Sequence, residues 1–142
     1  INTKKKVTIE DIRGLEKEYN FIMPNEVKEH YLLYNGGYPE KAIYVMEGRE
    51  YVVNYFFSIC CGEGMALEKT MKLLDDERIF PKWLIPFADD VCGNFFCYSI
   101  KTGEEGRIYY YNHEFEYGES PEKYVCVLAD SLVTFINALQ EE

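Results

Sequence analysis

The sequence predicts a single α+β domain, in which a central antiparallel or mixed β-sheet is flanked by two N-terminal helices and one C-terminal helix. Helical periodicity appears near both ends of the chain, whereas short apolar runs separated by turn residues fill its middle. No repeat, linker or low-complexity tract divides the 142 residues, so residues 1–142 are expected to form one domain. Hydrophobic residues make up 47% of the chain and aromatic residues 16%, which is enough for a sizeable core.

The first helix is expected over residues 8–19, because a threonine at its start and an aspartate three residues later have the capping-box spacing. The second is expected over residues 24–34, with a proline in its first turn. It should stop at the Asn-Gly-Gly sequence of residues 35–37, because glycine takes the left-handed conformation without strain. A closing helix is expected over residues 131–140, capped by Asp130.

The middle of the chain is mainly typical of strands. Glycine, proline, asparagine and aspartate separate its apolar runs, and a helix-like period interrupts them at residues 65–74. Strands are expected at residues 42–45, 49–53, 55–59, 83–85, 94–100, 107–112 and 125–128, with residues 46–48 as a hairpin turn.

Residues 84–98 are the expected centre of the sheet. Pro86 should close the first apolar run, because proline cannot donate a ladder hydrogen bond. Asp89 and Asp90 then form an acidic turn together with the glycine and asparagine that follow. The next run is aromatic on both faces, which suits a strand covered from both sides.

The net charge of −10 is distributed unevenly and excludes some partners. Residues 1–83 hold 12 lysines and arginines against 14 acidic residues, whereas residues 84–142 hold 3 against 11. Such a field repels nucleic acid and anionic membranes and favours basic partners, although acidic residues also serve plain solubility. No apolar run approaches the roughly 20 residues of a membrane helix, and no apolar segment follows the basic N-terminus. We therefore expect a cytoplasmic protein.

The motifs of common enzymes are missing from the sequence. It has no nucleophile elbow, P-loop, dinucleotide-binding glycine motif or His-x-x-x-His pair. His30 is expected to be solvated or structural, while His113 opens an acidic loop in which a carboxylate would raise its pKa. Asp89 with Asp90, or Glu104 with Glu105, would be candidate acid–base pairs, but strand neighbours point to opposite faces.

Cysteine usage indicates neither a disulfide framework nor a metal site. Five cysteines are an odd number, they lie in apolar surroundings, and their spacing lacks the paired ligands of a zinc site. We expect buried free thiols in a reducing compartment, with no metal and no cofactor.

Five groups of residues occur in a specific order along the chain. They are Pro24 leading into Tyr31-Leu32-Leu33-Tyr34-Asn35-Gly36-Gly37-Tyr38-Pro39, then Tyr55–Ile59, Leu84–Asp90, Gly93-Asn94-Phe95, and Leu128–Leu132 with Phe135. Together they cover roughly residues 9–139 and resemble the SUKH superfamily, which includes the fungal Smi1/Knr4-type regulators of cell-wall synthesis. Met23 departs from the leucine that is frequent in that family. The resemblance implies an α+β domain with a central sheet, in which these shared residues serve the fold.

The resemblance also implies a function. Bacterial members of the superfamily look like immunity proteins that bind and block cognate toxins, often nucleases. For this chain we expect a non-catalytic protein that docks a carboxylate- and tyrosine-bearing surface on a basic toxin. The candidate partner-binding residues are Glu104, Glu105, Tyr111, Glu114, Glu116, Tyr117 and Glu119, with Asp89 and Asp90 as further candidates.

Other functions stay open at this point. A regulatory scaffold that binds host proteins would match the fungal relatives, and an enzyme would require a concave pocket with a perturbed titratable group. An immunity gene should lie directly downstream of a large toxin gene, which separates the first two hypotheses. The strand tyrosines are compatible with a core position or with an interface, and the protein with a monomer or a homodimer.

Overall fold

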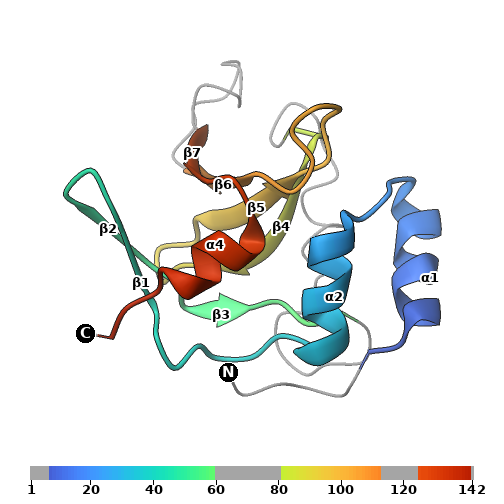
Figure 1. Cartoon of the computed structure of the whole chain (residues 1–142), viewed down its shortest axis with the longest axis horizontal. Helices are drawn as coiled ribbons and strands as arrows, with labels where there is room; N and C mark the ends of the chain where they lie inside the picture. The colour runs from blue at the N-terminus through green and yellow to red at the C-terminus, as the bar shows by residue number, and fades with distance from the viewer. Residues whose placement is uncertain (1–6, 60–80, 113–124, 142) are drawn as a thin grey trace.

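The computed structural model describes residues 7–59, 81–112 and 125–141 (Figure 1). The helix expected at residues 65–74 lies outside these ranges. The described elements, in chain order, are α1 (Ile9–Tyr19), α2 (Asn25–Leu33), β1 (Ile43–Met46), β2 (Arg49–Val52), β3 (Tyr55–Phe56), β4 (Leu84–Asp89), β5 (Phe95–Ser99), β6 (Ile108–Tyr111), β7 (Val125–Ala129) and α4 (Leu132–Asn137).

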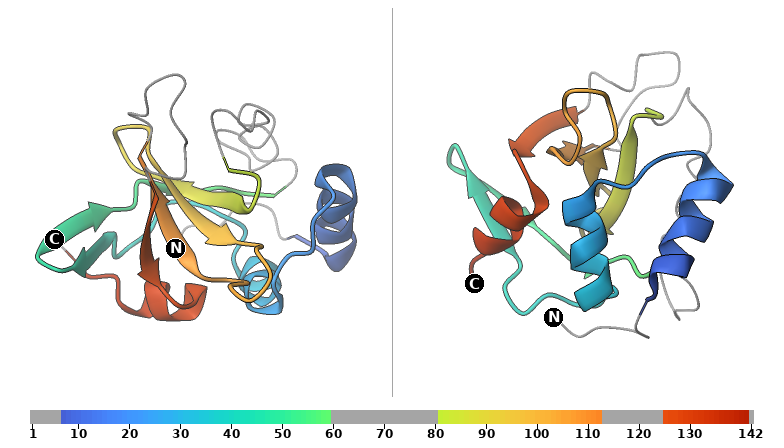
Figure 2. Two further views of the ribbon diagram at one scale, coloured as in Figure 1. Left: turned by 90° about the horizontal axis from the view of Figure 1, so that it is seen from above. Right: turned by 45° about the vertical axis from the view of Figure 1, so that its right-hand side comes forward.

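Strands β3 to β7 form one sheet, in which each strand pairs antiparallel with the next one along the chain (Figures 1 and 2). Strands β1 and β2 form a separate antiparallel hairpin. Its two-residue turn, Glu47-Gly48, has positive φ at both positions, as a type I′ turn requires. The α+β prediction is confirmed, and all described strand pairs are antiparallel.

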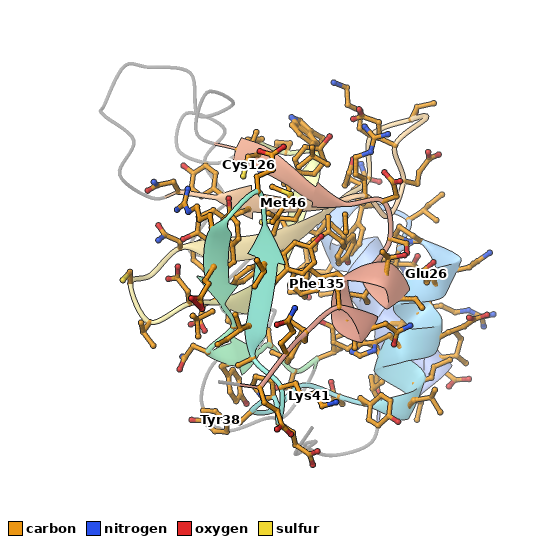
Figure 3. All side chains as sticks on the ribbon, turned by 60° about the vertical axis from the view of Figure 1, so that its left-hand side comes forward. Glu26, Tyr38, Lys41, Met46, Cys126 and Phe135 are labelled. Atoms are coloured by element: carbon orange, nitrogen blue, oxygen red, sulfur yellow. The ribbon has the colours of Figure 1, made fainter. Side chains whose placement is uncertain are left out.

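One face of the sheet carries the main core. Phe135 of α4 lies 4.8 Å from the ring of Tyr44 on the hairpin and 5.6 Å from that of Phe96 on β5 (Figure 3). Tyr51 of β2 lies 4.9 Å from Tyr110 of β6, in an edge-to-face arrangement. The hairpin and α4 therefore pack on the same face of the sheet as the buried residues of α1 and α2.

Helix α4 is held at its start by two side chains. The Ser131 hydroxyl accepts from the backbone N–H of Thr134 at 3.1 Å, and a Glu26 oxygen accepts from that of Val133 at 2.8 Å. Glu26 belongs to α2, so the first and last parts of the chain are joined at this cap (Figure 3). These bonds satisfy donors that a helix start leaves without an intrahelical partner.

Four predicted details of the elements are wrong. Ser131, and not Asp130, is the N-cap of α4. Helix α2 ends at Leu33 with Tyr34 extended, so no left-handed glycine terminates it. Pro86 lies inside β4, at a register shift that tolerates its missing N–H, and not at the end of the strand. Helix α4 is shorter than expected, because Gln140 leaves it to exchange two backbone hydrogen bonds with Ile43, at 3.1 and 2.7 Å.

Candidate functional site

The two acidic turns predicted as partner sites lie at opposite ends of the sheet. Strand register aligns Asp89 with Phe95, Phe95 with Tyr111, and Tyr111 with Val125 in one row. The turn of residues 101–106, with Glu104 and Glu105, joins the other ends of β5 and β6. The structure therefore divides the predicted acidic surface into two separate regions.

The Asp90 carboxylate binds within the β4–β5 turn. Its Oδ1 accepts from the backbone N–H groups of Cys92 and Asn94, both at 2.9 Å. Its Oδ2 accepts from the Asn94 amide at 3.0 Å and from the Tyr110 hydroxyl at 2.5 Å. Burial favours the neutral acid, but these hydrogen bonds outweigh it and hold the pKa of Asp90 below its usual value. Asp90 is therefore a turn former whose acceptors face inward.

Asp89 is half-buried beside the same turn. Its carboxylate accepts from the Asn54 amide at 3.2 Å, and its carbonyl accepts from the Asn54 N–H at 2.8 Å. Burial raises the pKa of Asp89, and the neighbouring Asp90 charge adds to this, although the Asn54 hydrogen bond opposes it. Asp89 therefore connects Asn54, just after β2, to β4.

The β5–β6 turn leaves more of its acidic groups at the surface. Glu104 is half-buried, with Oε1 3.1 Å from Arg107 Nη1 and Oε2 accepting from the Tyr109 hydroxyl at 3.4 Å. Glu105 is exposed and accepts the backbone N–H of Gly103 at 2.8 Å. The two glutamates use different partners, so they do not act as a pair on one atom.

Glu105 also lines a surface hollow of about 490 Å³. The hollow lies between the β5–β6 turn and the connector of α1 and α2. Ile22, in that connector, has 80% of its surface exposed. A carboxylate beside an exposed apolar side chain is a combination that protein interfaces use, with apolar contact inside a polar rim.

The remaining predicted site residues divide into two groups. Tyr111 is 2% exposed and belongs to a buried cluster with Leu84, Cys97 and Tyr109, so its side chain serves the core. This burial follows from β6, whose residues are buried on both faces. The other candidates, Glu114, Glu116, Tyr117 and Glu119, lie outside the described residues.

The Asn-Gly-Gly sequence after α2 connects the helix to the edge of the sheet. The Asn35 amide donates to the Ile59 carbonyl at 2.9 Å and its oxygen accepts from the Ile59 N–H at 2.7 Å. Gly37 exchanges two backbone hydrogen bonds with Phe56, at 2.9 and 2.8 Å. Gly36, between them, has φ of +76°, and a Cβ there would lie 2.8 Å from backbone atoms of residues 56 and 58. This landmark serves the fold.

His30 is structural, one of the two roles expected for it. Its ring lies 5.9, 5.7 and 6.4 Å from the rings of Tyr31, Tyr34 and Phe56. Burial among them lowers the pKa of His30 to about 4. Sequence reasoning did not identify the aromatic partners of His30 or the bond from Tyr110 to Asp90. Tyr31 and Tyr34 follow His30 at i+1 and i+4, a spacing that could have indicated these contacts. The contact with Phe56 and the bond from Tyr110 to Asp90 depend on which elements meet, for which the sequence contains no local signal.

The described cysteines are free thiols. Cys97 is buried and Cys126 half-buried, but Cys92 is exposed in the β4–β5 turn, so the prediction of burial is wrong for this residue. Within residues 7–59, 81–112 and 125–141, no group of three or more His, Cys, Asp or Glu side chains is placed to hold a metal. None of the helices in these same ranges has the length and apolar character needed to cross a membrane.

Comparisons with known proteins give one result. The chain matches no curated protein and no solved structure. A family model, described as the SMI1 / KNR4 family (SUKH-1), matches residues 6–138, which is nearly the whole chain and includes all the landmark groups. The chain therefore belongs to the SMI1/KNR4 family, SUKH-1.

Proposed function

We propose that this protein is a non-catalytic, cytoplasmic immunity protein that binds a cognate bacterial toxin with a basic surface. The observation that carries the proposal is the charge of residues 84–142, which hold 11 acidic residues against 3 basic ones on a SUKH-1 domain. The family resemblance supports the class of function, and the charge supports the mode of binding. Electrostatic attraction would speed the encounter, and tyrosines would supply contact area.

Two acidic regions are available for this contact. One is the turn with Glu104 and Glu105 beside the exposed Ile22. The other is the acidic segment with Glu114, Glu116, Tyr117 and Glu119. Because Asp90 and Tyr111 face inward, we leave them out of the proposed surface, and Asp89 contributes at most part of one carboxylate.

The test has a cellular and a kinetic part. Cells that express the toxin domain encoded directly upstream in the same genome should survive when this protein is co-expressed. With the purified pair, replacing Glu114, Glu116 and Glu119 by lysine should lower the association rate about tenfold or more at low salt. The melting temperature of this variant should stay close to that of the wild type.

A control variant carries the same charge change elsewhere. Glu10, Glu18 and Glu29 are exposed on α1 and α2, and their replacement by lysine should affect association much less. An association rate equal to the wild type for the first variant would contradict the acidic-surface mechanism. Failure to protect cells from the adjacent toxin, with capture of host enzymes only, would favour the regulatory scaffold instead.

A further inference from the structure

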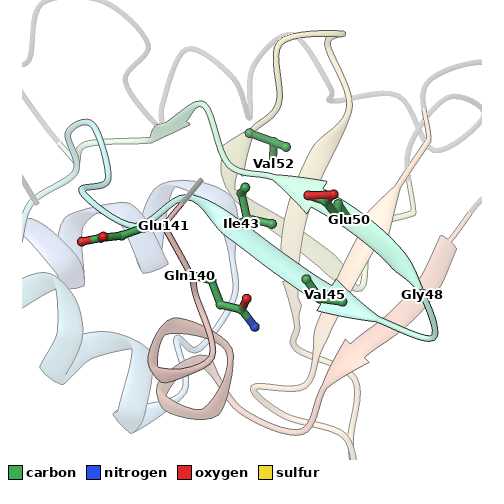
Figure 4. Close-up of a pocket in the computed structure, with 7 residues that line it drawn as sticks. All are labelled: Ile43, Val45, Gly48, Glu50, Val52, Gln140 and Glu141. Carbon is green, nitrogen blue, oxygen red and sulfur yellow. The ribbon is translucent and has the colours of Figure 1, made fainter.

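The β1–β2 hairpin has one face packed on the sheet and one face open to solvent. Side chains alternate between the two faces of a strand, so Tyr44 and Tyr51 point to the sheet. The Tyr44 hydroxyl donates to the Leu128 carbonyl, and the Tyr51 hydroxyl lies 3.7 Å from Cys126 Sγ. The opposite face, which we call the outer face, carries Ile43, Val45, Glu50 and Val52 (Figure 4).

The outer face is apolar and shallowly hollowed. A depression of about 630 Å³ lies over it, closed at one end by Gln140 and Glu141 of the C-terminal segment (Figure 4). Val45 is 45% exposed and Val52 is 36% exposed. These valines are cross-strand and diagonal neighbours of Ile43 and Glu50, so they form one continuous strip.

Among residues 7–59, 81–112 and 125–141, the edge of β2 beside this strip has backbone groups without a partner. Val53 donates its N–H to the Ala42 carbonyl across the hairpin, and backbone groups alternate in direction along an antiparallel strand. The N–H and C=O groups of Glu50 and Val52 therefore point away from β1. The edge is paired at Asn54, which donates to the Asp89 carbonyl. At Glu50 and Val52 no described residue supplies a backbone partner on this side.

The charge of the outer face is acidic. The described residues that line it include the carboxylates of Glu50 and Glu141 and no lysine or arginine. The adjacent Arg49 is held over the inner face, with its guanidinium carbon 4.7 Å from the centre of the Tyr51 ring and 5.7 Å from that of Tyr110. This cation is thus directed away from the strip that Glu50 shares with the two valines.

We propose that the β2 edge and the outer face beside it dock an extended segment of a basic protein partner, in which apolar and basic residues occupy every second position and so share one face of the segment. Backbone groups of the segment pair with Glu50 and Val52 and extend the hairpin by one strand. On the outer face its apolar side chains lie beside Val52 and its cations face Glu50, while Glu141 adds to the negative charge of this face. Backbone pairing gives affinity, and the acidic and apolar pattern of the face gives selectivity.

A second copy of this chain is a poorer occupant of the same edge. Symmetric pairing of two β2 strands would place the two Glu50 side chains on the same face of the joint sheet, where like charges are destabilising. Each copy also has a net charge of −10. A basic segment removes both costs. The proposal concerns a surface other than the β5–β6 turn and does not depend on which toxin, if any, the protein blocks.

The probe is an acetylated eight-residue peptide, Val-Ser-Lys-Ser-Val-Ser-Lys-Ser, titrated into the ¹⁵N-labelled full chain; valines and lysines share one face when this peptide is extended. We expect the amide resonances of Glu50 and Val52 to shift most. Glu50→Lys should weaken binding at least fivefold, whereas Glu18→Lys, an equal charge change on α1, should alter it less than twofold. Val52→Thr should weaken binding by a similar factor to Glu50→Lys, while Val127→Thr, at an exposed valine on β7, should not.

Two further peptides separate the edge from simple charge attraction. N-methylation of alternate residues of the peptide should abolish the Glu50 and Val52 shifts, because it removes the donors needed for strand pairing. The probe peptide with glutamate in place of each lysine should not bind. Equal effects of Glu50→Lys and Glu18→Lys, shifts centred on Glu104 and Glu105, or binding retained after N-methylation would each overturn the proposal. The proposal would also be overturned if sedimentation showed a wild-type dimer whose stability changes, in either direction, in the Glu50→Lys variant.

Discussion

The β4–β5 and β5–β6 turns both carry two adjacent acidic residues, but they direct them differently. Asp90 accepts four hydrogen bonds inside its own turn and from β6, whereas the Glu105 side chain is exposed and accepts one local backbone N–H. The first turn belongs to the landmark groups that resemble the SUKH superfamily, and the second does not. In this protein the acidic landmark residue Asp90 therefore binds inward, while the acidic residue Glu105 outside the landmarks stays available for contact.

The length of the side chain explains part of this difference. An aspartate oxygen reaches backbone N–H groups two to four residues away, which is the geometry of an Asx turn. In the second turn the longer side chain of Glu104 extends past the backbone to Arg107 and Tyr109. The net charge of a turn does not show whether its acidic side chains bind within the fold or are exposed.

The largest expected effect concerns Gly36, in the Asn-Gly-Gly landmark that follows α2. Gly36→Ala should lower the free energy of unfolding by about 3 kcal/mol or more, because its φ is +76° and a Cβ would lie 2.8 Å from backbone atoms of β3. Urea denaturation measures it. Gly14→Ala is the control: an added Cβ on α1 meets nothing within 4 Å, so stability should rise by about 1 kcal/mol. Equal behaviour of the two variants would contradict the proposed role of this landmark.

The pH dependence of stability should report on His30, which lies in α2 just before the Asn-Gly-Gly landmark. The pKa of His30 is about 4 in the folded protein and about 6.5 when unfolded, so the unfolded state binds the extra proton between these values. Stability from His30 is therefore complete above pH 6.5 and falls as the pH drops to 4, by up to about 3 kcal/mol. The His30→Gln variant should lack this component of the pH dependence. Parallel curves for wild type and variant would show that His30 is solvated.

Replacing Asp90 should have the next largest effect. Asp90→Ala leaves two backbone N–H groups and the Tyr110 hydroxyl without their acceptor, which should cost about 2 kcal/mol in the free energy of unfolding. Tyr110→Phe should cost about 1 kcal/mol, because it removes one of these bonds and keeps the ring packing. Chemical denaturation of the two single variants and the double variant would show coupling between them. Additive losses would mean that the hydrogen bond contributes no coupling energy.

Much of the fold was predictable from the sequence, because its signals are local. The capping box before α1 and the type I′ turn at Glu47-Gly48 depend on neighbours within four residues. The interior position of Pro86 in β4 was not predictable, since it depends on the register shift between β4 and β5 at this residue. The site was less predictable than the fold. Whether an acidic or tyrosine side chain is buried depends on how other elements cover each face of the sheet, as Tyr111 shows on a strand that is buried on both faces.

The smallest expected effect concerns Glu105, the exposed acidic residue of the β5–β6 turn. Glu105→Ala should change the free energy of unfolding by less than about 0.5 kcal/mol, because this exposed carboxylate makes one surface hydrogen bond that water can replace. Measured beside Asp90→Ala by the same denaturation method, it gives a matched pair of acidic turn residues. A loss above 1 kcal/mol would make Glu105 a turn former like Asp90 and remove it from the proposed partner surface. A neutral result together with slower association of Glu105→Lys with a basic partner would locate part of the contact at this turn.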